Sequence, residues 1–167
     1  DEGVDVSRVR RVPHCVSPSA AILVAADGER LVCAYNDPNL DRDASWLPLA
    51  EVADFDAVLA DVRWPEGATR VLDAARHAGK PAVLDGDIGP VEVLRDLATR
   101  VTHAIFSEIG LAQATGERDA VAGLHAMAAH TRAIIGVTLG AQGTQWLEHG
   151  QLHAAAADGR RARGAGG

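Results

Sequence analysis

The sequence predicts an α/β fold, a doubly wound and mainly parallel sheet with a small β-hairpin near the N-terminus. From residue 55 onward, short apolar runs alternate with segments of helical spacing. This alternation is typical of parallel strands joined by crossover helices, and strands that are apolar throughout indicate a sheet covered on both faces. Before residue 36, two apolar β-prone runs flank Asp27-Gly28-Glu29, and an Asp-Gly pair between such runs is typical of a hairpin turn.

Length and composition narrow the class of protein. The chain has 167 residues, which is room for one ordinary domain, and its hydrophobic content of 47% is normal for a globular protein. A formal net charge of −7 disfavours nucleic acid as a partner. No apolar run approaches the roughly 20 residues that a membrane span needs.

The first residues hold no initiator Met and no apolar signal core, so we expect a cytoplasmic protein whose chain starts inside a longer one. Cys15 and Cys33 are too few for a disulfide framework. Because each lies in an apolar setting, we expect both to be small buried residues. Residues 157–167 form a tail rich in Ala, Arg and Gly whose structure is ambiguous.

The hairpin is predicted over residues 18–36, with strands at 20–26 and 30–35. Alternation along the second strand places Leu31, Cys33 and Tyr35 on one side. An isolated two-stranded ribbon is only marginally stable in water. We therefore expect this hairpin to need a partner that covers its apolar side chains.

The α/β core is predicted over residues 54–156. Its first helix is indicated by Val71, Leu72, Ala75 and Ala78, which share one helical face, and by Pro65, which suits a first turn. The predicted order is strand 55–61, helix 65–79, strand 81–87, a helix after Pro90, strand 102–108, helices 109–116 and 118–130, strand 133–140, and a closing hairpin of strands 144–149 and 151–156.

Polar residues at the carboxyl ends of these strands are the candidate site, because ligands of open α/β sheets bind at that edge. Asp85 and Asp87 flank a glycine at one strand end. Such a pair could hold a metal, accept sugar hydroxyls or act as a base, and could equally be two capping aspartates before the Pro90 helix.

Arg63 follows the strand at 55–61 and precedes Trp64-Pro65. Its guanidinium could fork onto a phosphate, sulfonate or carboxylate, with Asp61 orienting it, or it could form an ordinary surface ion pair. The histidines show no metal-binding spacing, and Trp46 and Trp146 are expected to be packing residues.

Two further strand ends carry weaker signals. Ser107 and Glu108 end one strand and open a helix, where Glu108 could help hold a hydrated Mg²⁺ or could simply favour the helix dipole. Thr138 is followed by Gly140 and Gly143, spaced so that backbone N–H groups could approach a phosphate. This turn lacks the GKS or GKT of a P-loop and the GxGxxG of a Rossmann turn.

The order of these motifs resembles the central region of the PfkB, or ribokinase-like, carbohydrate kinases, over about residues 2–156. The resemblance rests on the hairpin and on the segments VLADVRW, AGKPAVLDGD, HAIFSEIGLAQATG and GVTLGAQGTQWLEHGQLH. The DVRW, LDGD and FSE variants are most similar to the branch that includes sulfofructose kinase.

The resemblance implies an ATP- and Mg²⁺-dependent kinase that phosphorylates a small sugar or sugar acid. Asn36, Arg63, Asp85 and Asp87 would then serve the substrate. The resemblance assigns the nucleotide to Ser107, Thr138, Gly140 and Gly143, and the metal to Glu108. The hairpin would be a lid over the sugar and the interface of a homodimer.

Three departures from the family pattern matter. The Asn-x-x-Glu motif reads Ser107-Glu108-Ile109-Gly110, without its final carboxylate. The family's amino-terminal strand and Gly-Gly sugar segment would precede Asp1. The GAGD motif with the catalytic base would correspond to the final GAGG, which places Gly167 at the base position, or that tail matches by chance.

We therefore expect the 167-residue chain alone to be inactive and its full-length parent to be the kinase. The alternative is a non-catalytic α/β module that binds a nucleotide or a sugar. A nucleotide-dependent oxidoreductase is disfavoured because the Gly-rich turn is missing.

Overall fold

A computed structural model describes residues 3–26, 28 and 30–157. The chain divides into two compact units, Asp1–Arg42 and Asp43–Gly167. Each unit is described by itself below.

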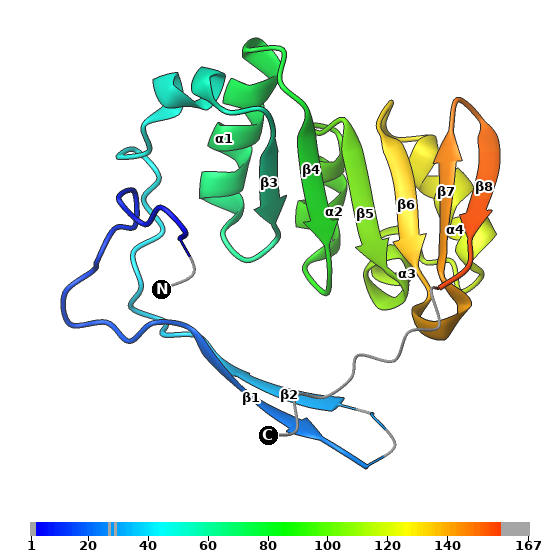
Figure 1. The fold of residues 1–167 in the computed structure, drawn as a ribbon, viewed down its shortest axis with the longest axis horizontal. Coiled ribbons are helices and arrows are strands. Elements are labelled where there is room, and N and C mark those ends of the chain that lie inside the picture. The colour runs from blue at the N-terminus through cyan, green and yellow to red at the C-terminus, as the bar shows by residue number, and fades with distance from the viewer. Residues whose placement is uncertain (1–2, 27, 29, 158–167) are drawn as a thin grey trace. The chain divides into compact units, whose positions relative to one another are not determined.

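The first unit contains the predicted hairpin. Strands β1 (Ser19–Val24) and β2 (Arg30–Tyr35) pair antiparallel, with Ser19 opposite Tyr35 and Leu23 opposite Leu31 (Figure 1). The described side chains of the two strands, residues 19–24 and 31–35, are exposed, Ile22 at 60% and Leu31 at 60% of their surface. Cys33 is exposed too, so its expected burial is wrong, because a two-stranded ribbon has no second layer to cover either of its faces.

The second unit is the α/β core. Within the described residues its sheet has six strands in the order β3-β4-β5-β6-β7-β8, with β3 to β6 parallel and β7 and β8 antiparallel. The elements are η1 (Leu49–Asp54), β3 (Val58–Asp61), α1 (Pro65–His77), β4 (Ala82–Gly86), α2 (Val91–Ala98), β5 (His103–Ser107), α3 (Glu108–Thr115), α4 (Ala120–Ala128), β6 (Ile134–Thr138), η2 (Gly140–Gln142), β7 (Thr144–Glu148) and β8 (Gln151–Ala155). The predicted fold class is confirmed.

Helices α1 to α4 all lie on one side of the sheet (Figure 1). The strand order β3-β4-β5-β6 follows the chain without reversal, and right-handed crossovers that step in one direction leave their helices on the same face. Burial alternates accordingly, with Leu84 fully buried and Leu59 72% exposed. The expectation that both faces are covered is therefore not met within the described residues. We call the uncovered side the open face, which carries Leu59, Val83, Ile105, Ile134 and Trp146.

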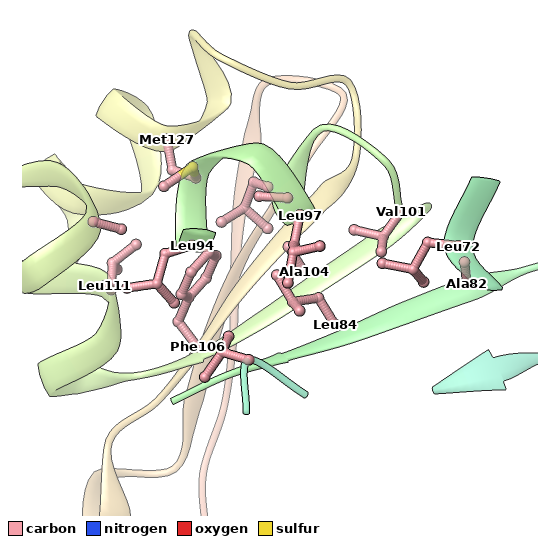
Figure 2. Close-up of a cluster of buried hydrophobic side chains, with 14 of the residues drawn as sticks. Leu72, Ala82, Leu84, Leu94, Leu97, Val101, Ala104, Phe106, Leu111 and Met127 are labelled. Atoms are coloured by element: carbon pink, nitrogen blue, oxygen red, sulfur yellow. The ribbon is translucent and has the colours of Figure 1, made fainter. Parts of the chain in front are cut away.

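The hydrophobic core lies between the sheet and these helices (Figure 2). Phe106 lies at its centre with 1% of its surface exposed, and a Cβ atom at Gly86 would fall 2.5 Å from the Phe106 ring. Glycine at position 86 is therefore what lets the ring pack on β4. Each helix contributes apolar side chains at helical spacing; those exposed by 2% or less include Leu72, Leu94, Leu97, Leu111, Leu124 and Met127.

The helix boundaries follow local signals. Pro65 opens α1, while α1 stops at His77, so Ala78 lies outside the face predicted for it. Ser107 and Asp119 cap α3 and α4 by accepting backbone N–H bonds, as expected of residues with short polar side chains. Among the described residues, no helix has both the length and the apolar character to cross a membrane.

Candidate functional site

The carboxyl ends of β3 to β6 lie side by side at one edge of the sheet. The strand register places Asp61 beside Asp85, Gly86 beside Phe106, and Ser107 beside Thr138. The turns that follow these strands therefore meet at that edge.

The β3–α1 turn presents Arg63 in a fixed backbone conformation. The carboxylate of Asp61 accepts the Arg63 backbone N–H at 3.0 Å. Trp64 stacks on Trp46, with ring centroids 5.9 Å apart, and a Cβ atom at Gly67 would come within 2.4 Å of the Trp64 ring. Asp61 thus holds the backbone of this turn, and the expectation that it orients the Arg63 guanidinium is wrong.

The Arg63 side chain instead contacts the next turn. Its Nη2 lies 3.5 Å from Oδ2 of Asp87, and the two side chains are 55% and 44% exposed. An ion pair this open to water contributes little stability by itself. It leaves the guanidinium accessible to a ligand.

Asp87 is also held from a third turn. The Ser107 hydroxyl donates to Oδ1 of Asp87 at 3.0 Å, and the Gly110 backbone N–H donates to Ser107 Oγ at 3.0 Å. A chain of contacts therefore runs from Arg63 through Asp87 and Ser107 to the first turn of α3. We call these four residues the Arg63–Gly110 network.

Asp85 and Asp87 take different positions although one residue separates them. Asp85 is the next-to-last residue of β4, with an exposed side chain on the open-face side in register with Asp61, whereas Asp87 lies in the turn and joins the network. β4 ends at Gly86, so the alternation that would place residues 85 and 87 on the same side no longer applies to Asp87. The carboxylate pair predicted from spacing is thus divided between the strand and the turn.

The turn after β6 is closed by hydrogen bonds within its own backbone. Leu139 N–H donates to the Gly143 carbonyl at 2.8 Å, and Gly143 N–H donates to the Gly140 carbonyl at 3.0 Å. Gly140 and Gly143 have φ of 55° and 90°, and a Cβ atom on Gly143 would fall 2.0 Å from the Ala155 carbonyl oxygen. Both glycines are therefore required by the turn itself. The Thr138 side chain is exposed at its start.

With this geometry in view, comparison with known proteins identifies the family. The model of the pfkB family carbohydrate kinases matches residues 1–161. The chain belongs to this family.

Several proteins of known structure share the fold. A protein of Agrobacterium tumefaciens assigned as a ribokinase is 38% identical, with a TM-score of 0.78 over 86% of this chain and 48% of its own. Arabidopsis thaliana ribokinase, solved with ribose and ATP, is 20% identical, with a TM-score of 0.70 over 92% of this chain and 53% of its own. Burkholderia thailandensis nucleoside kinase, solved with inosine, is 14% identical with a TM-score of 0.68, over 92% of this chain and 50% of its own. The chain thus spans about half the length of these structures.

The magnesium that the PfkB family implies finds few ligands here. Glu108 is exposed in the first turn of α3, where its charge also suits the helix dipole. Gly110 lies where the family motif leads one to expect a carboxylate, and a Cβ atom there would fall 2.1 Å from the Gly86 carbonyl oxygen. The described residues contain no group of three or more His, Cys, Asp or Glu side chains that could hold a metal. The described part of the chain therefore does not build a metal site of its own.

Two predicted residues do not belong to the described part of the α/β core. Asn36 directly follows β2 in the unit Asp1–Arg42, and its side chain is exposed. Gly167, which would be the catalytic base position if the final GAGG corresponds to GAGD, falls outside the described residues, as do the others from 158 onward. The substrate role of Asn36 stays a prediction.

Sequence reasoning missed two contributors to the site. Gly110 was noted only as a departure from the family motif, although its lack of a side chain is what lets α3 approach β4. Gln113 accepts the Gly89 backbone N–H at 3.3 Å and ties α3 to the turn after Asp87. A glycine in the first turn of a helix is an unfavourable helix former, and that was the available signal.

Proposed function

We propose that this chain is the central part of an ATP-dependent kinase that phosphorylates a hydroxyl group of a small sugar carrying an acidic group. Membership of the PfkB family supports carbohydrate kinase activity in general. The observation that supports an acidic sugar is the position of Arg63, exposed at the carboxyl edge and held by Asp87.

An arginine placed in this way suits an anion. The ion pair between Arg63 and Asp87 uses the Nη2 atom of Arg63. A guanidinium has five N–H donors in all. The remaining donors form a planar fork that matches carboxylate, sulfonate or phosphate oxygens better than a neutral hydroxyl. Because the Arg63–Asp87 contact is exposed and uses Nη2, the other donors stay accessible to a ligand anion while Asp87 holds the side chain. A sulfonated sugar, as in the sulfofructose kinase branch, is one member of this substrate class.

The other assignments follow the order of strand ends. Asp85 and Asp87 are assigned to the path of the transferred phosphoryl group, and Thr138, Gly140 and Gly143 to the nucleotide. Ser107 joins this edge as the cap of α3. Glu108 alone can serve Mg²⁺ only through water or together with ligands from the nucleotide or another segment. The group that accepts the sugar proton, a step commonly contributing about two to four orders of magnitude in rate, is assigned to a segment beyond the described residues.

The 167-residue chain by itself is proposed to be inactive. It covers about half of the length of the kinases of known structure that it matches, 48% in the 38%-identical relative. Its sheet also leaves the open face uncovered within the described residues, with Leu59 72% exposed. Purified 167-residue chain, free of host kinases, should release no ADP above background when sugar is added. Sugar-dependent release would contradict this.

The full-length protein is proposed to act in the cytoplasm and to form a homodimer through the hairpin. The apolar side chains of β1 and β2 support the dimer, since Ile22, Leu23 and Leu31 are each at least 60% exposed. Uncovered strands of this kind tend to pair, and a two-fold dimer is the commonest arrangement.

An ADP-release screen of the full-length protein tests the proposal. Neutral sugars, sugar acids, sulfonated sugars and phosphorylated sugars are supplied at equal concentration with ATP and Mg²⁺. We expect the highest kcat/KM with one of the three anionic classes. A neutral sugar as the best substrate would overturn the anionic assignment, and no turnover with any sugar would favour the non-catalytic binding module.

A further inference from the structure

We propose that Ser107 is a positioning residue for anionic substrate, acting through Asp87 on Arg63. This inference rests on the proposed function and concerns how the Arg63–Gly110 network works. It differs from the nucleotide role that the family resemblance gives to Ser107.

The hydrogen-bond directions at Ser107 are determined by its neighbours. A serine hydroxyl has one proton to donate and two lone pairs to accept with. Ser107 Oγ accepts the Gly110 backbone N–H at 3.0 Å, so its own proton is free to point at Oδ1 of Asp87, also 3.0 Å away. The carboxylate is thereby fixed through Oδ1, and its second oxygen is left facing Arg63 Nη2.

Gly110 is the reason that this geometry can form. It is buried, and a Cβ atom on it would fall 2.1 Å from the Gly86 carbonyl oxygen and 3.1 Å from that of Asp87. Both obstacles are backbone atoms, which cannot rotate aside as a side chain can. The first turn of α3 can therefore lie against the β4 turn only when position 110 is glycine, and this approach brings Ser107 within reach of Asp87.

The same packing explains the departure from the family motif. A glutamate at position 110 would have no room while α3 remains in this place. In this chain the start of α3 thus supports the turn that holds Arg63 and offers no inward carboxylate to a metal. The contacts of Ser107 point toward the substrate side of the edge.

Loss of the Ser107 hydroxyl should therefore affect the anionic sugar and spare ATP. Without the bond to Oδ1, Asp87 can rotate, and Arg63 loses the partner that holds it in place before substrate arrives. A side-chain hydrogen bond of this kind corresponds to about a 3- to 10-fold change in apparent affinity. A general loss of stability would instead change the KM values for sugar and ATP together, or neither.

The experiment compares four variants of the full-length protein, using the best anionic sugar from the screen and its neutral analogue. Ser107→Ala removes the hydroxyl, and Ser107→Thr keeps it. Asp119→Ala is the matched control. Asp119 caps α4 by accepting the Ala122 N–H at 2.8 Å, so this substitution removes a helix cap away from the network. Arg63→Ala is included as the reference for loss of anion recognition.

We expect Ser107→Ala to raise KM for the anionic sugar about 3- to 10-fold with KM for ATP unchanged. Ser107→Thr should restore the wild-type values, and Asp119→Ala should lower thermal stability without altering substrate preference. If Ser107→Ala behaves like Asp119→Ala while Arg63→Ala still loses the anionic preference, the role of Ser107 is wrong and the proposed function stands. If Arg63→Ala has no effect on the preference for the anionic sugar, the role of Ser107 and the proposed anionic substrate are both wrong.

Discussion

The α/β core buries its apolar side chains, whereas the N-terminal hairpin unit leaves its own exposed. In the core, Leu72 is fully buried and Phe106 is 1% exposed, whereas Leu23 and Val24 in the hairpin are 61% and 68% exposed. Both units were predicted from similar apolar runs. The difference shows that an apolar strand indicates where burial is needed, while the neighbouring elements decide whether this part of the chain supplies it.

The same contrast recurs between the two sides of the sheet. Leu84 on the helix side of β4 is fully buried, and Leu59 on the open face of β3 is 72% exposed. The crossovers of β3 to β6 supply helices to one side only (Figure 1). The hairpin and the open face are thus two of the surfaces where apolar side chains remain uncovered in the described part of the chain.

The largest expected effect contrasts Phe106 with Leu23. Phe106→Ala removes a ring packed on Gly86 in the centre of the core, and such truncations cost about 3–5 kcal/mol of unfolding free energy. Leu23→Ala removes an exposed side chain and should change stability by no more than about 0.5 kcal/mol. Urea unfolding of dilute full-length protein measures both. Equal losses in the two variants would remove the distinction between the units.

Gly110 should be nearly as sensitive as the core, although it lies at the edge of the sheet. Gly110→Ala forces a Cβ atom against the Gly86 carbonyl oxygen, and overpacking against backbone costs about 1–3 kcal/mol or more. Gly116→Ala is the control: its φ is 84° and nothing lies within 4 Å of the added Cβ, so only the backbone penalty of about 1 kcal/mol applies. Thermal unfolding should give a lower melting temperature for Gly110→Ala than for Gly116→Ala. The reverse order would contradict the close approach of α3 to β4.

A charge introduced on β2 tests whether the exposed hairpin forms a dimer interface. Leu31→Glu places a carboxylate on an exposed apolar strand, so a dimer formed through the hairpin should weaken at least tenfold, or about 1.4 kcal/mol. Val4→Glu alters an equally exposed residue of the same unit outside the hairpin and should leave association unchanged. Sedimentation equilibrium of the full-length protein measures the dimer dissociation constant of each variant. A wild-type monomer at high concentration, or a dimer indifferent to Leu31→Glu, would count against the hairpin interface.

The smallest effect concerns Asp37, which ties the loop before β1 to the loop after β2. Its carboxylate accepts the backbone N–H of Val16 at 2.8 Å and of Asn39 at 2.9 Å, and these bonds lower the pKa of Asp37 below its ordinary value of 3.8. A lowered pKa means that the tie is fully present above pH 3.8 and is lost as the pH falls through the folded-state pKa. An NMR titration of the Asp37 carboxyl carbon should show a midpoint below 3.8. A midpoint at or above that value would show that the two bonds are not maintained in solution.

Much of the fold could be predicted because local patterns determine it. The Asp-Gly turn, the apolar runs and the helical spacing place every strand and α-helix of the described chain close to its observed position, whereas the 3-10 helices η1 and η2 were not predicted. Cys33 was misjudged, and coverage of the second face was not met, because burial depends on which elements pack against a strand. The sequence does not show this directly.

The candidate site was predictable only in part. Strand ends indicated Arg63, Asp87 and Ser107, since residues that follow parallel strands meet at one edge. Their contacts were not predictable: Asp61 binds a backbone N–H, and Asp87 takes the side chains of both Arg63 and Ser107. These pairings depend on how closely the turns approach one another, as at Gly110, and spacing in the sequence does not encode that approach.

The most direct test of the account is Arg63→Ala in the full-length protein, assayed with the preferred anionic sugar. Loss of a charge-assisted contact should raise KM for that sugar roughly 10- to 100-fold and leave KM for ATP nearly unchanged. Arg76→Ala is the matched control, because Arg76 is an exposed arginine in an ion pair with Asp73 at the far end of α1, and neither KM should change. If Arg63→Ala raises both KM values equally, or neither, Arg63 is a structural ion-pair residue and the anionic substrate must be abandoned.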